Sequence, residues 1–291
     1  MRVNIKTALK SAADQLQSKN EEHKLEAEVL LMFALEKPRS FLHAWPEKKL
    51  TEKQSEVFQQ LIKLRLKGEP IAYITGEKEF WSLPLKITAD VLIPRPETEL
   101  LVELALEKLD HDKNSKVADL GTGSGAIALA LAHERPNWKI TATDSSTNAL
   151  KIAEENASLL HINNITFKSG RWCEALTEND YDLIISNPPY VAENDSYLKQ
   201  GDLPFEPQQA LTSGVDGLDD IKSIIQQSQI YLKPGGWLML EHGYDQEKPV
   251  AVLLNEAGYQ AIHCYHDLAG HPRASIAITH YPDKPHLHIP A

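Results

Sequence analysis

The amino-acid sequence predicts an α/β protein in which a small N-terminal helical bundle precedes a larger domain built on a mostly parallel β-sheet. Two observations indicate this fold: apolar residues recur at helical spacing before residue 70, and short apolar strands alternate with helices after residue 96. A length of 291 residues is enough for about two domains. We therefore divide the chain into a helical bundle over 1–75, a β-hairpin linker over 76–95 and an α/β domain over 96–291.

The N-terminal part carries the signals of several short helices. Apolar residues at helical spacing define two of them, within Leu25 to Ala34 and Val57 to Leu66. Thr51, followed three residues later by Gln54, has the pattern of a capping box at the start of the second of these helices. Gly68 predicts where that helix ends.

A hairpin and a series of strands and helices follow. The run from Lys78 to Ile93 predicts the hairpin, and Pro96 is placed at the first turn of an apolar-striped helix. Short buried strands are then expected at Lys116–Leu120, Lys139–Thr143, Ile165–Lys168, Tyr181–Ser186, Gly236–Glu241 and Ser275–Thr279, with helices near 126–134, 147–159, 218–231 and 246–257. In such sheets ligands bind beyond the C-terminal ends of the strands, so functional motifs are expected there. The tail from His280 to Ala291 is predicted to be loosely ordered.

Composition excludes several classes of protein. No apolar run approaches the ~18 residues of a membrane helix, and Met1 to Gln17 lacks the pattern of a secretory signal. The two cysteines, Cys173 and Cys264, form no disulfide framework, which indicates a reducing cytoplasm. His263, Cys264 and His266 would spread over both faces of a strand, so no metal site is expected.

The charge of the chain is unevenly distributed. The formal net charge is −11; residues 1–90 hold 15 basic and 13 acidic residues, whereas residues 91–291 hold 15 and 28. An acidic body repels phosphate backbones, so direct binding of nucleic acid is not expected.

The first strand of the α/β domain leads into a glycine-rich loop, Asp119-Leu-Gly121-Thr122-Gly123-Ser124-Gly125-Ala126. Glycines let a ligand approach the backbone closely, and the helix that follows offers free N–H groups. The next strand ends at Asp144, whose carboxylate could accept hydrogen bonds from ribose hydroxyls. The same letters fit a nicotinamide-cofactor loop, so the loop predicts a nucleotide-like cofactor without identifying it.

A second motif, Asn187-Pro188-Pro189-Tyr190, follows the strand that ends at Ser186. The prolines stiffen the segment and remove two backbone N–H groups, which leaves a row of acceptors: the Asn187 side-chain oxygen and nearby carbonyls. Acceptors in this arrangement suit a planar NH₂ group, and the Tyr190 ring could pack on its face.

Together these motifs resemble class I S-adenosylmethionine-dependent methyltransferases that act on planar amino groups. Over nearly the whole chain the sequence is similar to the release factor glutamine methyltransferases, the HemK/PrmC family. The matching segments are Gly68–Gly76, Glu79–Trp81, Leu92–Glu99, Asp119–Gly125, Asn187–Tyr190, Glu206-Pro207 with Ala210-Leu211, and Glu241–Gly243. The resemblance implies a Rossmann-like, seven-stranded, mostly parallel sheet and a cytoplasmic enzyme of translation termination.

The resemblance implies methylation of the side-chain amide nitrogen, N5, of the glutamine in the Gly-Gly-Gln loop of class-1 peptide chain release factors. Asn187, Pro188 and Tyr190 are then the expected catalytic residues, and Pro189 joins them in binding the substrate. Asn187 Oδ1 and the Pro188 carbonyl would accept the two amide hydrogens and aim the nitrogen lone pair at the donor methyl group. No metal is expected.

The donor, S-adenosyl-L-methionine, is expected to contact residues that follow the strand ends. Gly121, Thr122, Gly123, Ser124 and Gly125 would approach the methionine moiety, Asp144 the ribose, and Trp172 the adenine, with Asn187 also in contact. For Trp172 a purely structural place in the core stays open.

Other residues of the matched motifs have open roles. Asp119 could meet the amino group of the donor or cap a helix, and Arg95 and Glu97 could cap a helix or shape the glutamine pocket. His242 is either structural or part of the pocket, and Glu206 lies in a long loop, 191–217, that could form a lid.

Two rival functions remain from other classes. A dehydrogenase would bind a nicotinamide cofactor but would leave Asn187 to Tyr190 without a role. An adenine-specific DNA methyltransferase shares the Asn-Pro-Pro-Tyr motif but would need a basic recognition surface. We therefore expect a monomeric cytoplasmic enzyme whose partner is a class-1 release factor, docked on the helical bundle, with no direct contact to nucleic acid or membrane.

Overall fold

The computed structural model describes residues 3–17, 22–111 and 113–280, and its contacts divide the chain into two compact units. One unit comprises Met1–Glu77 with Gln200–Phe205, and the other comprises Lys78–Lys199 with Glu206–Ala291. The three-part division proposed from the sequence stays a prediction. The expected loose tail falls almost wholly on residues 281–291, which lie outside the described residues.

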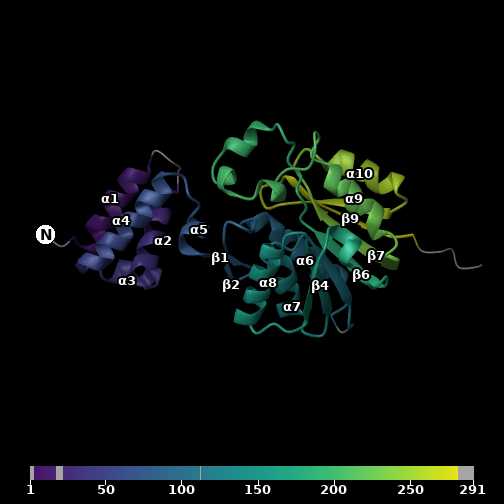
Figure 1. Cartoon of the computed structure of the whole chain (residues 1–291), viewed down its shortest axis with the longest axis horizontal. Helices are drawn as coiled ribbons and strands as arrows, with labels where there is room; N and C mark the ends of the chain where they lie inside the picture. The colour runs from purple at the N-terminus through teal and green to yellow at the C-terminus, as the bar shows by residue number, and fades with distance from the viewer. Residues whose placement is uncertain (1–2, 18–21, 112, 281–291) are drawn as a thin grey trace, which may run out of the picture. The chain divides into compact units, whose positions relative to one another are not determined.

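The first unit is a bundle of helices (Figure 1). Its elements are α1 (Ile5–Leu16), α2 (His23–Leu35), α3 (Arg39–Ala44), α4 (Glu52–Leu66) and α5 (Ile71–Thr75). The predicted capping box is confirmed at α4, where Thr51 Oγ1 accepts from Gln54 N at 3.2 Å and Gln54 Oε1 accepts from Thr51 N at 3.0 Å. Apolar faces of the helices meet in a core that includes Leu16, Leu30 and Phe58. The expected helical bundle is thus confirmed.

A buried charge cluster holds a distant loop segment within this unit. Arg65 on α4 donates from Nη2 and Nε to the carboxylate of Glu26 at 2.8–3.1 Å, and from Nη1 to Asp202 Oδ1 at 2.9 Å. Phe205 lies so close to Gly68 that a Cβ added there would be 2.9 Å from the ring. Gln200–Phe205 therefore packs on the helical bundle, although 124 or more residues separate it from the bundle's last helix along the chain.

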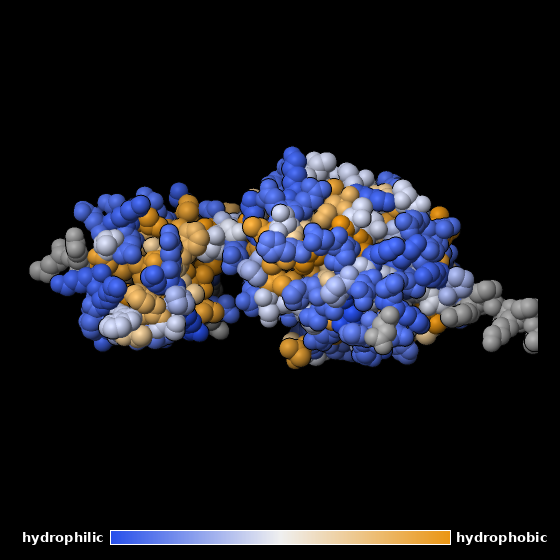
Figure 2. Space-filling view, turned by 90° about the horizontal axis from the view of Figure 1, so that it is seen from below, coloured by the Kyte–Doolittle hydropathy of each residue, from blue (hydrophilic) through white to orange (hydrophobic). Residues whose placement is uncertain are grey.

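The surface of the first unit includes exposed apolar residues on α2. Leu25 and Phe33 are each nearly half exposed, and both lie on this helix. Figure 2 shows hydrophobic residues among the hydrophilic ones on the face in view. None of the helices in the described residues has the length and apolarity needed to cross a membrane.

The second unit contains a seven-stranded sheet with the strand order β5-β4-β3-β6-β7-β9-β8. Neighbouring strands pair in parallel except around β9, which is antiparallel to both β7 and β8. The strands are β3 (Lys116–Leu120), β4 (Lys139–Asp144), β5 (Ile165–Ser169), β6 (Tyr181–Ser186), β7 (Leu232–Glu241), β8 (Gln260–His266) and β9 (Pro272–Ile278). The predicted seven-stranded, mostly parallel sheet is confirmed.

The order of the strands fixes where a ligand site can form. β4 and β5, which follow β3 in the chain, lie on one side of β3 in the sheet, and the next strand, β6, lies on the other side of β3. Right-handed crossovers place the helices of these two halves on opposite faces of the sheet. The helices are α6 (Glu99–Lys108), α7 (Ala126–Glu134), α8 (Thr147–Leu159), α9 (Asp219–Ser228) and α10 (Glu247–Glu256) (Figure 1). A crevice is expected where the direction reverses, at the C-terminal ends of β3 and β6.

The hairpin and β7 show the largest differences between the predicted and the observed extent of an element. The hairpin strands are β1 (Glu77–Phe80) and β2 (Leu83–Lys86), so pairing stops at residue 86 although Val91 and Ile93 are buried. Alternating apolar residues indicate that one face of a segment is buried, but a segment can be buried in this way without pairing with another strand. β7 begins at Leu232, four residues before the predicted start, because the strand continues through a register shift opposite Tyr181–Leu183.

The start of the helix after the hairpin also differs. Pro96 was expected in the first turn of an α-helix, but Pro96–Thr98 forms a 3₁₀ turn that precedes α6. The long loop 191–217 contains three further 3₁₀ turns, Ser196–Lys199, Leu203–Phe205 and Gln208–Ala210. Ser146 caps α8, where its side-chain hydroxyl accepts from Ala149 N at 3.2 Å.

The buried side chain of Asn156 joins the β-hairpin to the glycine-rich loop. Its Oδ1 accepts from Lys86 N at 2.7 Å, and its Nδ2 donates to Lys86 O at 3.1 Å and to Ser124 O at 2.9 Å. We expect Asn156→Ala to lower the free energy of unfolding by about 2–4 kcal/mol, since these buried groups would lose their partner. Urea unfolding measures the change. The exposed Glu154→Ala on the same helix is the control, and equal stability of the two variants would contradict the prediction.

Candidate active site

The two predicted motifs begin at neighbouring positions on one edge of the sheet. Leu120 of β3 is paired in parallel with Ser186 of β6, and Ser186 Oγ donates to Leu120 O at 2.6 Å. The glycine-rich loop starts at Gly121 and the Asn-Pro-Pro-Tyr segment at Asn187. Both loops therefore leave the sheet side by side, at the point where the strand order reverses.

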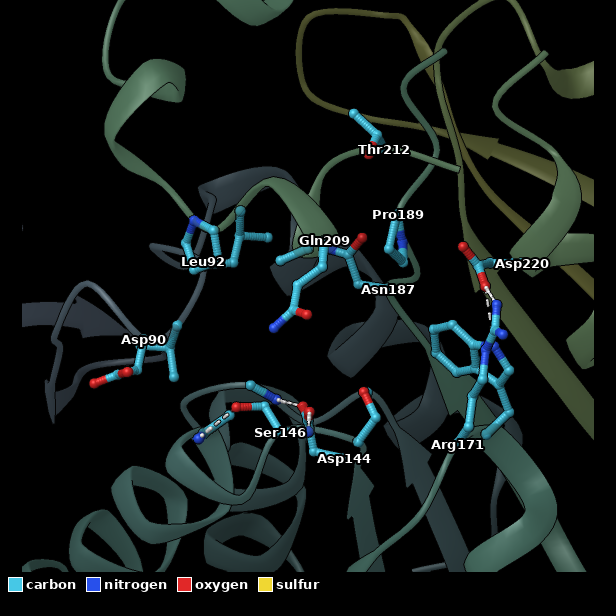
Figure 3. A pocket seen from close by; sticks show the side chains of 18 of the residues that line it. Asp90, Leu92, Asp144, Ser146, Arg171, Asn187, Pro189, Gln209, Thr212 and Asp220 are labelled. Carbon is cyan, nitrogen blue, oxygen red and sulfur yellow. Dashed lines mark hydrogen bonds and ion pairs between the residues drawn. The ribbon is translucent and has the colours of Figure 1, made fainter. Parts of the chain in front are cut away.

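A cavity of about 510 Å³ lies at this edge (Figure 3). Its volume falls in the range of sites for small molecules and cofactors. The lining residues come from the segment before α6, the ends of β3, β4, β5 and β6, the long loop and the starts of α8 and α9. They are Asp90, Val91, Leu92, Gly121, Gly123, Asp144, Ser145, Ser146, Ala149, Gly170, Arg171, Trp172, Asn187, Pro189, Pro207, Gln209, Ala210, Thr212 and Asp220.

Gly121 allows the glycine-rich loop to pass close to an aromatic ring. Its φ is +72°, a conformation that favours glycine, and its N–H donates to Thr143 O at 2.8 Å. A Cβ at this position would lie 3.0 Å from the Trp172 ring. The absence of a side chain at Gly121 thus keeps the space beside the indole open.

Asp144 is held at the end of β4 by backbone donors. Its Oδ2 accepts from Gly123 N at 2.9 Å and its Oδ1 accepts from Ser146 N at 2.8 Å. Burial raises the pKa of this carboxyl above its ordinary value, and the backbone donors oppose that shift. Each carboxylate oxygen has two lone-pair sites, so both oxygens keep an acceptor position for a ligand hydroxyl. The carboxylate faces the cavity beside Ser146 (Figure 3).

Trp172 lines the cavity and is held there by Asp220. Trp172 Nε1 donates to Asp220 Oδ1 at 3.1 Å, and Arg171 Nη2 donates to the same oxygen at 2.9 Å (Figure 3). The backbone N–H of Asp220 in turn donates to Ser213 Oγ at 2.8 Å. The indole is only 8% exposed, yet it lines the cavity, so it is both a core residue and part of the wall.

Asp119 is buried beneath the glycine-rich loop. Its Oδ2 accepts from Thr122 Oγ1 at 2.7 Å and from Ala128 N at 3.2 Å, whereas Oδ1 has no hydrogen-bond partner among the described residues. Burial raises the pKa of Asp119 to about 7. A buried carboxylate oxygen without a partner, two residues before the cavity-lining Gly121, is a position where a ligand donor would be stabilised. With Asp144, Trp172 and Gly121, the residues present fit a nucleoside ligand that carries an amino group.

The side chain of Asn187 ends a chain of hydrogen bonds. Asn187 Nδ2 donates to Thr98 Oγ1 at 3.0 Å, and Thr98 Oγ1 donates to Glu241 Oε2 at 2.7 Å. Tyr190 Oη donates to the other oxygen of Glu241 at 3.2 Å. Burial raises the pKa of Glu241 to about 7 and also raises the pKa of Tyr190. Asn187 lines the cavity, so its amide connects this buried chain to the ligand space.

The long loop contributes to the cavity wall from its second half. Glu206 accepts from Ile93 N at 3.1 Å and pairs with Arg95, and the residues after it, including Pro207 and Gln209, line the cavity. The Gln209 side chain extends toward the space above Asp144 and Ser146 (Figure 3). Arg95 precedes the 3₁₀ turn but its side chain does not cap it. The guanidinium group instead forms an ion pair with Glu206.

The predicted site residues divide into two sets by position. Six of them line the cavity: Gly121, Gly123, Asp144, Trp172, Asn187 and Pro189. The other five are not among the residues that line the cavity: Thr122, Ser124, Gly125, Pro188 and Tyr190. His242 is buried, with Nδ1 bonded to Gly243 O at 2.9 Å and Nε2 to Ser275 Oγ at 2.8 Å, so both ring nitrogens are occupied by protein atoms.

Sequence reasoning did not assign site roles to Thr98, Asp220, Gln209 or Glu241. Glu241 ends a predicted strand, so its place at the same edge as Asn187 could have been inferred from the topology. Thr98 lies in the matched segment Leu92–Glu99, but no local pattern marks Asp220 or shows that the partners of Thr98 and Asp220 lie 89 and 48 residues away along the chain.

Comparisons with known proteins show which family the chain is similar to. Residues 7–76 match the family model described as PrmC N-terminal domain, and residues 97–214 match the one described as Methyltransferase small domain. A release factor glutamine methyltransferase of Coxiella burnetii is 51% identical over 94% of this chain and 99% of its own length. One of Vibrio cholerae is 48% identical over 95% of this chain and 97% of its own length.

Solved structures share the fold at low identity. A methyltransferase from Pyrococcus furiosus has a TM-score of 0.52 at 20% identity, covering 76% of this chain and 98% of its own. The hMettl16 catalytic domain, solved with an RNA hairpin, has a TM-score of 0.57 at 17% identity, covering 81% of this chain and 85% of its own. These similarities establish the fold only.

The fold and the cavity at its switch point define an α/β methyltransferase. More narrowly, the chain belongs to the release factor glutamine methyltransferase family. This membership confirms the resemblance found in the sequence and the expected class of enzyme, a methyltransferase dependent on S-adenosyl-L-methionine, in place of a dehydrogenase.

Proposed function

We propose that this enzyme methylates the side-chain amide nitrogen of the glutamine in the Gly-Gly-Gln loop of class-1 peptide chain release factors. One observation carries the proposal: Asn187 lines the same cavity as Asp144 and Trp172, so an amide-binding group and a nucleoside-binding group face one space. The names of the curated relatives, release factor glutamine methyltransferase, support the same substrate.

The donor site is proposed on the residues that fit a nucleoside. Asp144 would accept from the ribose hydroxyls, the Trp172 ring would pack on the adenine, and Gly121 and Gly123 would leave room for the methionine moiety. Thr122, Ser124 and Gly125 would support that loop from behind. When bound, S-adenosyl-L-methionine supplies a sulfonium methyl group as the electrophile.

The acceptor site is proposed on the Asn-Pro-Pro-Tyr segment. An amide nitrogen is a weak nucleophile because its lone pair is delocalised into the carbonyl group. Asn187 Oδ1 and the Pro188 carbonyl would accept its two hydrogens and fix its direction, while Pro189 and Tyr190 would confine the side chain. Proximity and orientation of this kind can supply up to about 7–11 kcal/mol of the barrier.

The helical unit is proposed as the docking surface for the release factor. The apolar residues Leu25 and Phe33 on α2 lie exposed there and could be covered by a protein partner. The acidic part of the chain, residues 91–291, would attract a basic protein and repel nucleic acid. We also propose that the enzyme acts as a monomer in the cytoplasm.

Transfer of a labelled methyl group tests the proposal. We expect label on a purified, unmethylated class-1 release factor and none on a factor whose Gly-Gly-Gln glutamine is replaced by alanine. Label on both factors would place the modification at another residue. Label on DNA and on neither factor would instead support the adenine methyltransferase and overturn the proposed substrate.

A further inference from the structure

The side chain of Asn187 can present either of two ends to a substrate. Its carbonyl oxygen and its NH₂ group have nearly the same shape, so packing alone does not choose between them. A substrate NH₂ group requires the oxygen, because two donors facing each other cannot form a hydrogen bond. The hydrogen bonds made by the other end of the amide must therefore decide the orientation.

Thr98 makes that choice through the single hydrogen of its hydroxyl group. Glu241, when ionised, can only accept, so the Thr98 hydroxyl donates to Glu241 Oε2 at 2.7 Å. The lone pairs of Thr98 Oγ1 then face Asn187 and need a donor, which Asn187 Nδ2 supplies at 3.0 Å. The carbonyl oxygen of Asn187 is thereby directed away from Thr98.

The fold holds these three residues together. Leu240 of β7 is paired with Ser186 of β6, so Glu241, the last residue of β7, lies beside Asn187, the residue that follows β6. Thr98 and Glu241 are 4% and 1% exposed, and Tyr190 Oη occupies the second oxygen of Glu241 at 3.2 Å. Water has little access to this chain, so its direction depends on the protein groups alone.

We propose that Thr98 and Glu241 are positioning residues, which orient the Asn187 amide so that Oδ1 accepts from the NH₂ group of the substrate. The inference rests on the proposed function, because it assigns Asn187 to an amide substrate. Neither residue touches the substrate; both act through Asn187.

Protonation of Glu241 would reverse the chain of hydrogen bonds. A protonated Glu241 donates to Thr98, whose own hydrogen is then free to turn toward Asn187 and favours the flipped amide. Burial raises the pKa of Glu241 to about 7, so this change falls near neutral pH. The titratable and charged groups around it are Tyr190, Arg273 on β9, Glu97 on the 3₁₀ turn and the adjacent His242; Arg95 in turn acts on Tyr190.

The activity is expected to rise with pH, because the ionised form of Glu241 favours the productive orientation of the Asn187 amide. Below the pKa, Glu241 is protonated and the productive orientation is lost; above it, Glu241 is ionised and the orientation is favoured. We expect kcat of the wild type to rise between about pH 6 and pH 8, with a midpoint near 7. In Glu241→Gln this rise should be absent, and kcat should stay low throughout the range.

Two substitutions at Thr98 separate positioning from packing. Thr98→Val keeps the volume but removes the hydroxyl, and we expect kcat to fall about 10- to 100-fold with the KM for the donor little changed. Thr98→Ser restores a hydroxyl and should recover most of the activity. Wild-type kcat in Thr98→Val, or equal losses in both variants, would overturn the inference.

A measurement without substrate keeps the test independent of the proposed function. The side-chain amide signals of Asn187, assigned by their loss in Asn187→Asp, are expected to shift with pH in the wild-type ¹⁵N NMR spectrum, with a midpoint near 7. The shift should disappear in Glu241→Gln. Signals that do not move with pH would overturn the inference, whereas a titrating signal in an enzyme that labels no release factor would overturn only the proposed substrate.

Discussion

Asn187→Ala is expected to lower kcat for methyl transfer by at least about 100-fold, the scale measured when one preorganised hydrogen-bonding group is removed from an active site. The alanine leaves the substrate NH₂ group without its side-chain acceptor, so the nitrogen is no longer aimed at the donor methyl group. The affinity for S-adenosyl-L-methionine should change little, because Asp144 and Trp172 keep their partners. Single-turnover transfer to the release factor measures kcat, and calorimetry measures the affinity.

Asn255→Ala is the matched control for this prediction. Asn255 is an exposed asparagine on α10, so its loss should leave both quantities unchanged. A loss of donor binding as large as the loss of kcat in Asn187→Ala would contradict the proposed role of Asn187. It would show that Asn187 acts mainly in binding S-adenosyl-L-methionine.

Gly121→Ala is expected to weaken donor binding by about 10- to 100-fold. The new Cβ would lie 3.0 Å from the Trp172 ring, so the indole must move, and crowding of this kind costs about 1–3 kcal/mol. Asp220 holds Trp172 Nε1 at 3.1 Å, which leaves the ring little freedom to yield without losing that bond. Calorimetric titration with S-adenosyl-L-methionine measures the loss.

Gly258→Ala separates crowding from backbone strain. Gly258 also has a positive φ, +84°, but a Cβ there would meet nothing within 4 Å. The free energy of unfolding should fall by a similar amount in both variants, because alanine is strained in the left-handed backbone conformation. Only Gly121→Ala should also lose donor affinity. Unchanged donor affinity in Gly121→Ala would remove Trp172 from the proposed donor site.

The folding pattern of the chain was largely predictable because it depends on residues close together in the sequence. The capping box at Thr51 and the alternation of strands and helices each involve neighbours within a few positions, and each is confirmed. The predicted hairpin was too long, because buried apolar residues such as Val91 and Ile93 give the same alternating sequence pattern as a paired strand.

The candidate site was predicted in part, for a related reason. Motifs that form a loop from consecutive residues, such as Gly121 to Gly125 and Asn187 to Tyr190, are visible in the sequence together with the strands that position them. Residues that serve the site from another element are not. Asp220 reaches Trp172 across 48 positions, and nothing near Asp220 in the sequence indicates this partner.

By itself the sequence determined the class of fold, the edge of the sheet that holds the site, the family and the two loops that meet there. Only the tertiary structure decided which residues complete the site, because hydrogen bonds between distant residues depend on strand register and helix packing. Thr98 and Glu241 are 143 residues apart, and Arg65 and Asp202 are 137 apart. The pairing of β6 with β7 sets Glu241 beside Asn187, and Thr98, hydrogen-bonded to both, is the residue proposed to orient the asparagine amide.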